Sequence, residues 1–278
     1  MVCRLGLLAL VCVFAMQGQT RGDFRALENP AGPDASAALA RKVEGKGALM
    51  PSSGGFLAHV AVGGPWRTLI TLMNPKVSDT GKAALKFYTS TGAPLTVTLA
   101  DGRKSVTSSA FEITLPPRNS LFLETINLPA AVQTGYPQLD VSSGNIAGYG
   151  VFRAVVAGLP NLEAVVPLEW GITDQAMIAY DNTRGFVTSV AIANPWGFFP
   201  SELVADVYDE DGLLLATYRR VLPGQSQVAF ETYREWPATA GRRGVVRLSQ
   251  IGGLGYAALA LLFNPTGSVT TAPVPDVR

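Results

Sequence analysis

ANPWGFFPSE, residues 193–202, carries three aromatic side chains in four positions directly after an Asn-Pro dipeptide. The stretch MNPKVSDTG, residues 73–81, has the same dipeptide but no aromatic residue. Proline gives a β-ladder no donor and presets φ for a turn, and Asn can bond its own backbone at the first turn position. Both stretches are therefore predicted to end a β-strand, and their relationship decides how the chain is organised.

The sequence around these two turns repeats. Asn74 and Asn194 lie 120 residues apart, and ALKFYTSTGAPL (84–95) matches VADVYDEDGLLL (204–215) at the same offset. Each of the longer segments ends a strand-like run with a glycine that a hairpin needs for its positive φ. The first half of each copy therefore aligns without a gap.

The second half of each copy aligns at another offset. LPPRNSLFLET (115–125) matches LPGQSQVAFET (222–232) at 107 residues, as does Gly148-Tyr149 with Gly255-Tyr256. Two constant offsets imply that the first copy has one insertion of 13 residues, and its Asp101-Gly102 dipeptide predicts a longer hairpin or protruding loop. We interpret the pattern as a tandem duplication.

Both copies have the pattern of β-strands. Runs of five to nine residues rich in Val, Ile, Leu, Thr and Tyr are separated by turn residues, at the spacing typical of a β-sandwich or barrel. We predict an all-β fold with two tandem immunoglobulin-like antiparallel β-sandwich domains, residues 55–172 and 173–275. One short helix is expected at 232–235, where Thr and Glu have capping-box spacing before Trp236-Pro237.

The N-terminus indicates export. Arg4 precedes an apolar run of about ten residues, which is too short to span a bilayer, and Val13-Phe14-Ala15 fits a cleavage site. We interpret residues 1–18 as a signal peptide and 19–54 as a flexible leader, with a weak helix near 34–43. The protein is predicted to be secreted, to the extracellular space, periplasm or cell envelope.

Composition excludes several kinds of site. Cys3 and Cys12 both fall in the predicted signal peptide, so the mature chain has no thiol for a disulfide or a metal. It then carries 21 basic and 21 acidic side chains without a basic cluster, which argues against nucleic acid as a partner. No later apolar run is long enough for a membrane span. We expect no cofactor and no metal, because a single imidazole cannot build a His-based site.

Catalytic signals are weak. His59 is the only histidine, and it alternates with apolar residues on a predicted strand, so we interpret it as structural. Glu124 and Glu231 occupy equivalent positions in the two copies, and a glycosidase pair would instead share one cleft. Asp209-Glu210-Asp211-Gly212 lacks the spacing and the distal Glu of a calcium loop and is interpreted as a solvated hairpin turn.

The aromatic loop is the main binding candidate. Trp196, Phe198 and Phe199 could stack on sugars or anchor a partner, with Trp66 as a weaker candidate. The alternative is that these side chains plug one end of a sandwich or fill the interface between the copies. We favour the plug, because exposed apolar patches are uncommon on soluble monomers.

The turn pattern, with strands ending in Asn-Pro, a DG-type hairpin and "LP" before the next strand, resembles a family of uncharacterised secreted bacterial proteins with paired immunoglobulin-like β-sandwich modules. The resemblance, which includes the residues of 237–274, covers most of 56–274 and is strongest in the second copy. It implies fold and export, and no chemistry.

We therefore expect an exported, non-catalytic structural, adhesive or protein-interaction protein, whose partner is a protein or glycan at the cell surface. A pair of carbohydrate-binding modules is the first alternative and a glycoside hydrolase is the second.

Overall fold

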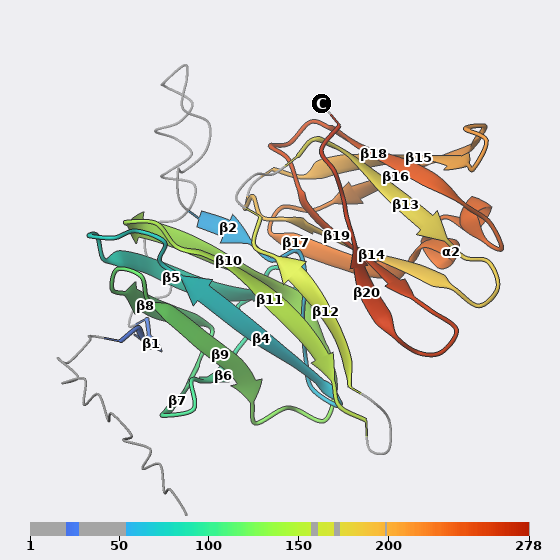
Figure 1. Cartoon of the computed structure of the whole chain (residues 1–278). Coiled ribbons are helices and arrows are strands. Elements are labelled where there is room, and N and C mark those ends of the chain that lie inside the picture. The colour runs from blue at the N-terminus through green and yellow to red at the C-terminus, as the bar shows by residue number, and fades with distance from the viewer. Residues whose placement is uncertain (1–20, 28–53, 157–160, 170–172, 198, 278) are drawn as a thin grey trace, which may run out of the picture.

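The computed structural model describes residues 21–27, 54–156, 161–169, 173–197 and 199–277. Strands make up 62% of the structure and helices 3%, and antiparallel sheets form sandwich-like units, which confirms the all-β prediction. Figure 1 shows two such units, which we call module 1 and module 2. The predicted signal peptide and the weak helix near 34–43 lie outside the described residues.

Module 1 consists of two facing sheets. Sheet A has the order β1-β8-β5-β10-β2, with β3 also paired to β10. Its strands are β1 (Asp23–Ala26), β8 (Ala110–Leu115), β5 (Gly81–Thr89), β10 (Gln133–Ser143), β2 (Gly54–Phe56) and β3 (Val60–Val62). Sheet B has the order β12-β11-β4-β9-β6-β7. Its strands are β12 (Leu162–Pro167), β11 (Ala147–Ala154), β4 (Trp66–Met73), β9 (Ser120–Ile126), β6 (Val97–Ala100) and β7 (Ser105–Ser108).

Module 2 has two sheets of four strands. Sheet C has the order β13-β18-β15-β16, and sheet D has the order β17-β14-β19-β20. The strands of sheet C are β13 (Gln175–Asp181), β18 (Arg243–Ile251), β15 (Ser201–Asp209) and β16 (Leu214–Leu222). Those of sheet D are β17 (Ser226–Glu231), β14 (Val187–Asn194), β19 (Ala257–Phe263) and β20 (Val269–Ala272).

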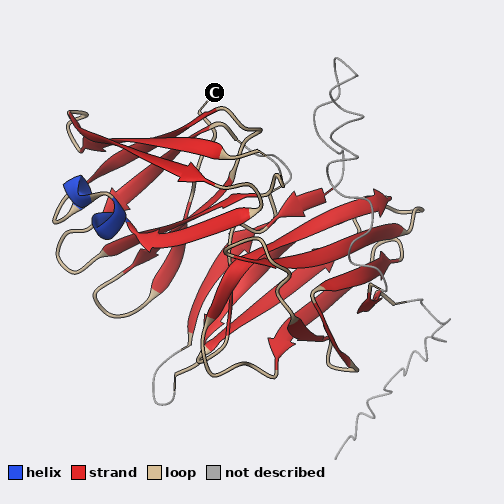
Figure 2. Ribbon diagram, turned by 180° about the vertical axis from the view of Figure 1, so that it is seen from behind, coloured by secondary structure: helices blue, strands red, loops and turns tan. Residues whose placement is uncertain are grey.

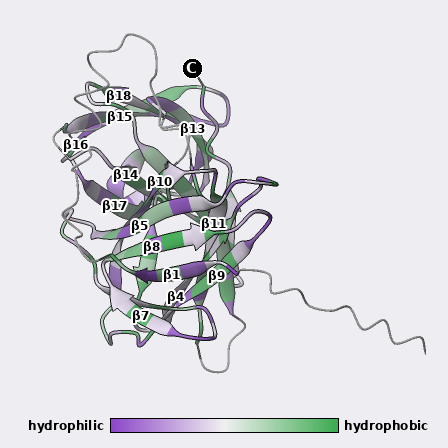
Figure 3. Ribbon diagram, turned by 90° about the vertical axis from the view of Figure 1, so that its left-hand side faces the viewer, coloured by the Kyte–Doolittle hydropathy of each residue, from purple (hydrophilic) through white to green (hydrophobic). Residues whose placement is uncertain are grey.

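Alternating apolar and polar residues place one face of most strands in a core. In β5, GKAALKFYT, the first, third, fifth and seventh side chains are buried and the others are more exposed. Hydrophilic positions accordingly interrupt hydrophobic ones along the strands of module 1 in Figure 3. A period of two is what a sheet with one solvated face requires.

The two modules have the same strand order. The eight shared strands are β2, β4, β5, β8, β9, β10, β11 and β12 in module 1 and β13 to β20 in module 2. Numbered one to eight in chain order, they form sheets with the orders 1-6-3-4 and 8-7-2-5 in both modules. An immunoglobulin domain has its seventh strand beside the sixth, whereas here β11 and β19 pair with the second strands, β4 and β14. The sandwich is thus as expected, and its strand order differs from that of an immunoglobulin domain.

Strand register agrees with most of the sequence matches. Gly81 lies opposite Leu115, and Ser201 lies opposite Leu222, at the offsets 120 and 107. The match of Gly148-Tyr149 with Gly255-Tyr256 is wrong. Tyr149 pairs with Thr71 of β4. The equivalent of Thr71 in module 2 is Ala191, and Ala191 pairs with Leu259 and not with Tyr256. Shared Gly-Tyr letters hid a shift of three residues: the connection before β18 is two residues longer than the one before β10, and one further residue is added before β19.

The insertion of module 1 forms the predicted hairpin. β6 and β7 pair across a turn at Asp101–Lys104, and β6 extends sheet B beyond β9. Among the described residues of module 2, no strand lies at the corresponding edge, and β17 pairs with β14 alone.

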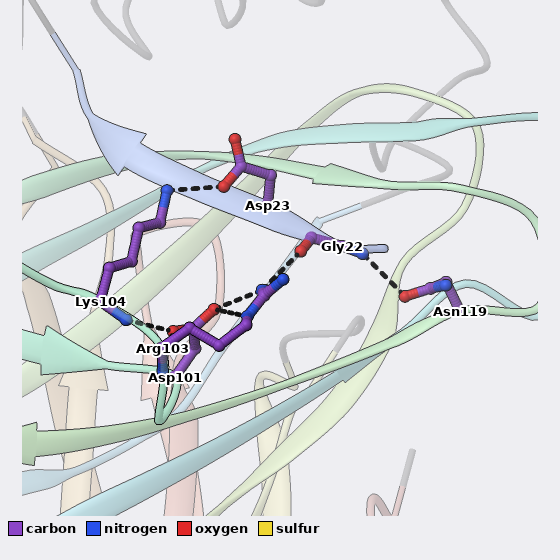
Figure 4. Close-up of polar contacts among 6 residues, drawn as sticks. All are labelled: Gly22, Asp23, Asp101, Arg103, Lys104 and Asn119. Atoms are coloured by element: carbon purple, nitrogen blue, oxygen red, sulfur yellow. Dashed lines mark hydrogen bonds and ion pairs between the residues drawn. The ribbon is translucent and has the colours of Figure 1, made fainter. Parts of the chain in front are cut away.

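The leader differs from the expectation, because part of it is a strand. β1 pairs with β8, and Phe24 is 1% exposed in the core of module 1. Figure 4 shows how the β6–β7 turn holds this segment: Lys104 Nζ lies 2.6 Å from Asp23 Oδ1, and Arg103 donates to the Gly22 carbonyl. The Lys104 ammonium also holds the pKa of the Asp23 carboxyl below its ordinary value. A single Phe between charged residues has no visible periodicity, so sequence alone misses this strand.

The predicted short helix is present as α2 (Thr232–Glu235), followed by the 3₁₀ helix η1 (Pro237–Thr239). Figure 2 shows both at the outer end of module 2. The predicted capping box is wrong, because the N-cap is Glu231 and no side chain caps it. The Thr232 hydroxyl instead donates to the carbonyl of Thr188 in β14, which ties the helix to the core.

Asn74 and Asn194 are buried pins that join strand ends. Each amide donates to a carbonyl five residues later, at 2.7 Å for Asn74 and 2.8 Å for Asn194. Each also donates to the carbonyl that ends β8 or β16, at 2.9 Å and 3.3 Å. The side-chain oxygen of each accepts the N–H two residues later. The Asn-Pro motif thus connects the two sheet layers as well as ending a strand.

Replacing either pin should destabilise the protein. Asn74→Ala and Asn194→Ala leave buried carbonyls without donors, and each should lower the free energy of unfolding by about 2–3 kcal/mol. Asn264→Ala is the control, since Asn264 only orders its own turn at the surface, and it should cost less than about 1 kcal/mol. Urea denaturation measures all three. Equal losses at the three positions would contradict the assigned role.

Candidate functional site

The two modules are joined by the outer face of sheet D. Ala191, Ala257 and Leu259 point away from the core of module 2, and all three are 5% exposed or less. They belong to the same packed cluster as the core of module 1. Figure 1 shows β20 beside β12 at this junction, where the Thr271 hydroxyl donates to the carbonyl of Val165. β14 and the first part of β19 are therefore buried on both faces of sheet D.

The free edge of β17 is also covered by module 1. The Gln227 N–H donates to the carbonyl of Ser90 at 3.0 Å. Gly92, with φ of 86°, lies so close that a Cβ on it would come 2.3 Å from the carbonyl oxygen of Gln225. An uncovered edge strand invites pairing with other chains, so this contact protects β17 as the β6–β7 hairpin protects β9.

A matched pair of glycines tests the joint. Gly92 and Gly212 sit at equivalent hairpin positions with positive φ, but a Cβ on Gly212 would meet nothing within 4 Å. Gly212→Ala should therefore cost only the backbone strain, about 1 kcal/mol. Gly92→Ala should cost about 3 kcal/mol, because it also separates the modules. Urea denaturation followed by tryptophan fluorescence distinguishes them, and equal effects would show that the close approach does not matter.

A cleft of about 280 Å³ lies between the modules. Its lining is almost entirely apolar and comes from β3, β4, β10 and β11 of module 1 and from β14, β17 and β19 of module 2. The lining residues include His59, Trp66, Phe152, Ala229, Phe230 and Phe263. The floor is continuous with the joint, since Ala191 and Leu259 belong to both.

His59 forms part of the cleft wall. Its ring packs edge-on against Phe152 at 5.1 Å between centroids, and Nδ1 lies 2.8 Å from the amide nitrogen of Gln227. The ring is half-buried and surrounded by apolar atoms, and this burial lowers its pKa to about 4. The imidazole is therefore neutral at ordinary pH, which fits the structural role expected from sequence.

Glu169 is a second titratable group at the joint. It pairs with Phe56 through the backbone, and the nearby backbone N–H of Ala258 in β19 lowers the pKa of its carboxyl. Burial is the larger effect and raises the pKa of this carboxyl to about 7. Nothing in the sequence pattern singled out this residue, because its burial results from the docking of the modules.

These two groups predict opposing effects of pH on stability. In the folded state His59 stays neutral down to pH about 4, whereas in the unfolded state it is protonated below pH 6.5. The free energy of unfolding therefore falls as the pH drops through this window. The folded state keeps the Glu169 proton up to pH about 7 while the unfolded state loses it above 4.5, so stability falls as pH rises through that window.

Single variants should uncover each slope. In Glu169→Gln only the effect of His59 remains, so the free energy of unfolding should rise as the pH is raised from 4 to 6.5. In His59→Gln only the effect of Glu169 remains, so the free energy of unfolding should fall as the pH is raised from 4.5 to 7. Each change should amount to about 1–3 kcal/mol. Urea denaturation across pH 4–8 measures this, with wild type expected to be flatter than either. Parallel curves for all three proteins would refute the assignment.

The aromatic candidates have different environments. Trp196 is half-buried, packs against the cluster that the core of module 1 shares with Ala191, Ala257 and Leu259 of sheet D, and donates from Nε1 to the carbonyl of Gly255 at 3.2 Å. Trp66 packs against the same cluster and lines the cleft. Phe199 is 40% exposed, and Phe198 lies outside the described residues. The environments of Trp196 and Trp66 are those expected of side chains that fill an interface, and the structure does not bring Trp66, Trp196 and Phe199 into one lining.

The carboxylate candidates also separate. Glu231 lines the cleft and forms an ion pair with Arg234 at 2.6 Å, whereas Glu124 forms one with Arg67 on sheet B. Glu231 is the only carboxylate among the described lining residues, so the glycosidase alternative lacks a second one there. In the described part of the chain no cluster of His, Cys, Asp or Glu could hold a metal ion.

Sequence reasoning missed an apolar surface on the outer face of sheet B. Phe122 of β9 is 64% exposed, Met73 of the adjacent β4 is 38% exposed, and Val165 of β12, on the other side of β11, is 48% exposed. Thr71 lies between Phe122 and Tyr149 in one row across the sheet. We call the surface formed by these side chains the sheet B face; its residues are Leu69, Thr71, Met73, Phe122, Tyr149, Val151 and Val165. The available signal was the apolar residue at outward positions of β9, in SLFLET.

Comparison with known proteins assigns no relative: no protein-family model, curated protein or solved structure matches this chain. The resemblance to secreted tandem-module proteins therefore stays a prediction. Within the described residues, no helix has the length and hydropathy to cross a bilayer.

Proposed function

We propose that this chain is an exported, non-catalytic structural or adhesive protein, built by duplication of one β-sandwich, that holds a protein partner on the sheet B face. The observation that carries the proposal is an asymmetry between the modules. The positions of Thr71, Phe122 and Tyr149 correspond in register to Ala191, Ala229 and Leu259 on sheet D. That face of sheet D lies against module 1, whereas its counterpart in module 1 is uncovered and carries larger side chains.

The size and chemistry of the sheet B face suit a protein partner. Phe122 and Met73 are exposed on the adjacent strands β9 and β4, and Leu69 and Val151 connect them across the sheet to exposed Val165 on β12. Apolar surfaces of this kind commonly mark interaction sites. Ion pairs at its margin, Arg153 with Glu163 and Arg67 with Glu124, supply the polar rim that non-obligate interfaces have. A central aromatic anchor such as Phe122 is the kind of residue that dominates binding energy.

A glycan is a second candidate, for one specific reason. Phe122 and Tyr149 lie two strands apart in one row, which separates them by about 9–10 Å. Two rings at this spacing on a flat sheet can stack on two sugar rings of one chain. This moves the carbohydrate hypothesis from the 196–199 loop to the sheet B face.

One set of variants tests both candidates. Phe122→Asp should abolish at least about 90% of the retention of envelope proteins on immobilised protein, whereas Val77→Asp, at a 67% exposed loop position, should change nothing. Depletion of the protein from solution by insoluble polysaccharides tests the glycan candidate. Tyr149→Ala should reduce this depletion, and Val77→Asp again serves as the control. Retention unaffected by Phe122→Asp in both assays would exclude the sheet B face.

A further inference from the structure

The cleft between the modules has the properties of a small-molecule site, separate from the sheet B face. Its volume of about 280 Å³ is about twice that of the 150 Å³ apolar cavity that binds benzene. It approaches the lower end of ordinary ligand pockets, about 300 Å³. A molecule of one or two rings fits this space, and a long lipid chain does not.

The walls of the cleft select for an uncharged, apolar ligand. Trp66, Phe152, Phe230 and Phe263 line it together with small and aliphatic residues of sheet D. The single lining carboxylate, Glu231, is already paired with Arg234. No lysine or arginine is among the described lining residues, so an anion has no partner there. Flat aromatic walls favour a ring over a flexible chain.

His59 supplies one directional contact. Because Nδ1 accepts from the Gln227 amide nitrogen at 2.8 Å, the imidazole proton resides on Nε2. Within the described part of the chain, no residue hydrogen-bonds to Nε2. A neutral N–H in an apolar wall gains most from a carbonyl or ether oxygen, because water is largely excluded. The ligand should therefore carry one acceptor.

We propose that this cleft binds an uncharged molecule of one or two rings, aromatic or alicyclic, that presents a single carbonyl or ether oxygen to His59. The site is composite, since His59 comes from module 1 and the opposite wall from sheet D of module 2. Its ligand thus bridges the modules and stabilises their docked arrangement. The inference does not depend on the sheet B face or on the proposed partner.

A fluorescent naphthalene ketone, prodan, is a suitable probe, because it is uncharged, has two rings and one carbonyl, and changes its emission with polarity. Titrating the full protein into a fixed low concentration of prodan should give blue-shifted emission and a dissociation constant of about 100 μM or tighter. Quenching of Trp66 fluorescence should accompany binding. Unshifted prodan emission at saturating protein would overturn the proposal.

Two equivalent positions give a matched pair of variants. Ala229 is the exposed position of β17 and lines the cleft, and Phe122 is its counterpart on the sheet B face. Ala229→Phe narrows the cleft with a side chain that module 1 carries there, and should weaken probe binding at least about tenfold. Phe122→Ala should leave binding unchanged. The reverse result would place the probe on the sheet B face and refute the cleft site.

The role of His59 has its own readout. His59→Phe keeps an aromatic ring but removes the N–H, so prodan affinity should fall about threefold to tenfold. Bound prodan should then emit at shorter wavelength, because its carbonyl loses a hydrogen bond. Unchanged emission from the bound probe would contradict the assigned contact. Far-UV circular dichroism checks that each variant is folded. If a hydrophobic peptide displaces prodan and no small ring compound does, the cleft binds a protein segment and the proposal is overturned.

Discussion

Burial of β14 and the first part of β19 on both faces of sheet D is the constraint on which the arrangement of this protein depends. A sandwich needs only one apolar face per sheet, but β14 and β19 carry apolar side chains on both. The second face is covered by module 1, so the hydrophobic effect that closes each sandwich also joins them. Neither the inter-module cleft nor the low pKa of His59 would exist without this contact.

The two modules solve the same problems in different ways. The edge of β9 is covered by the inserted β6–β7 hairpin, and the edge of β17 is covered by the Ser90–Gly92 turn of the other module. The inserted hairpin also holds β1, which completes sheet A on its far edge. Identical strand order therefore coexists with different surfaces, and those differences are where we place the proposed functions.

The functions that we propose both rest on contact surfaces. The neutral His59 and the elevated pKa of Glu169 both result from burial at the joint, and their protonation is coupled to docking of the modules. An apolar face presented to a partner and an apolar cleft between rigid units need no reactive group. This agrees with the role of a binding and structural protein that we propose.

The sequence by itself determined the strand content, the two-fold repetition, the inserted hairpin and the Asn-Pro strand ends, because turn residues and a period of two are local properties. It even carried a sign of the joint in AALALLF, a continuous apolar run typical of a strand buried on both faces. Only the tertiary structure decided which strands pair, that Trp196 packs against the cluster at the joint of the modules, that β1 completes a sheet, and that Phe122 stays exposed. Each of these depends on contacts between residues far apart in the chain, and neighbouring letters do not encode such contacts.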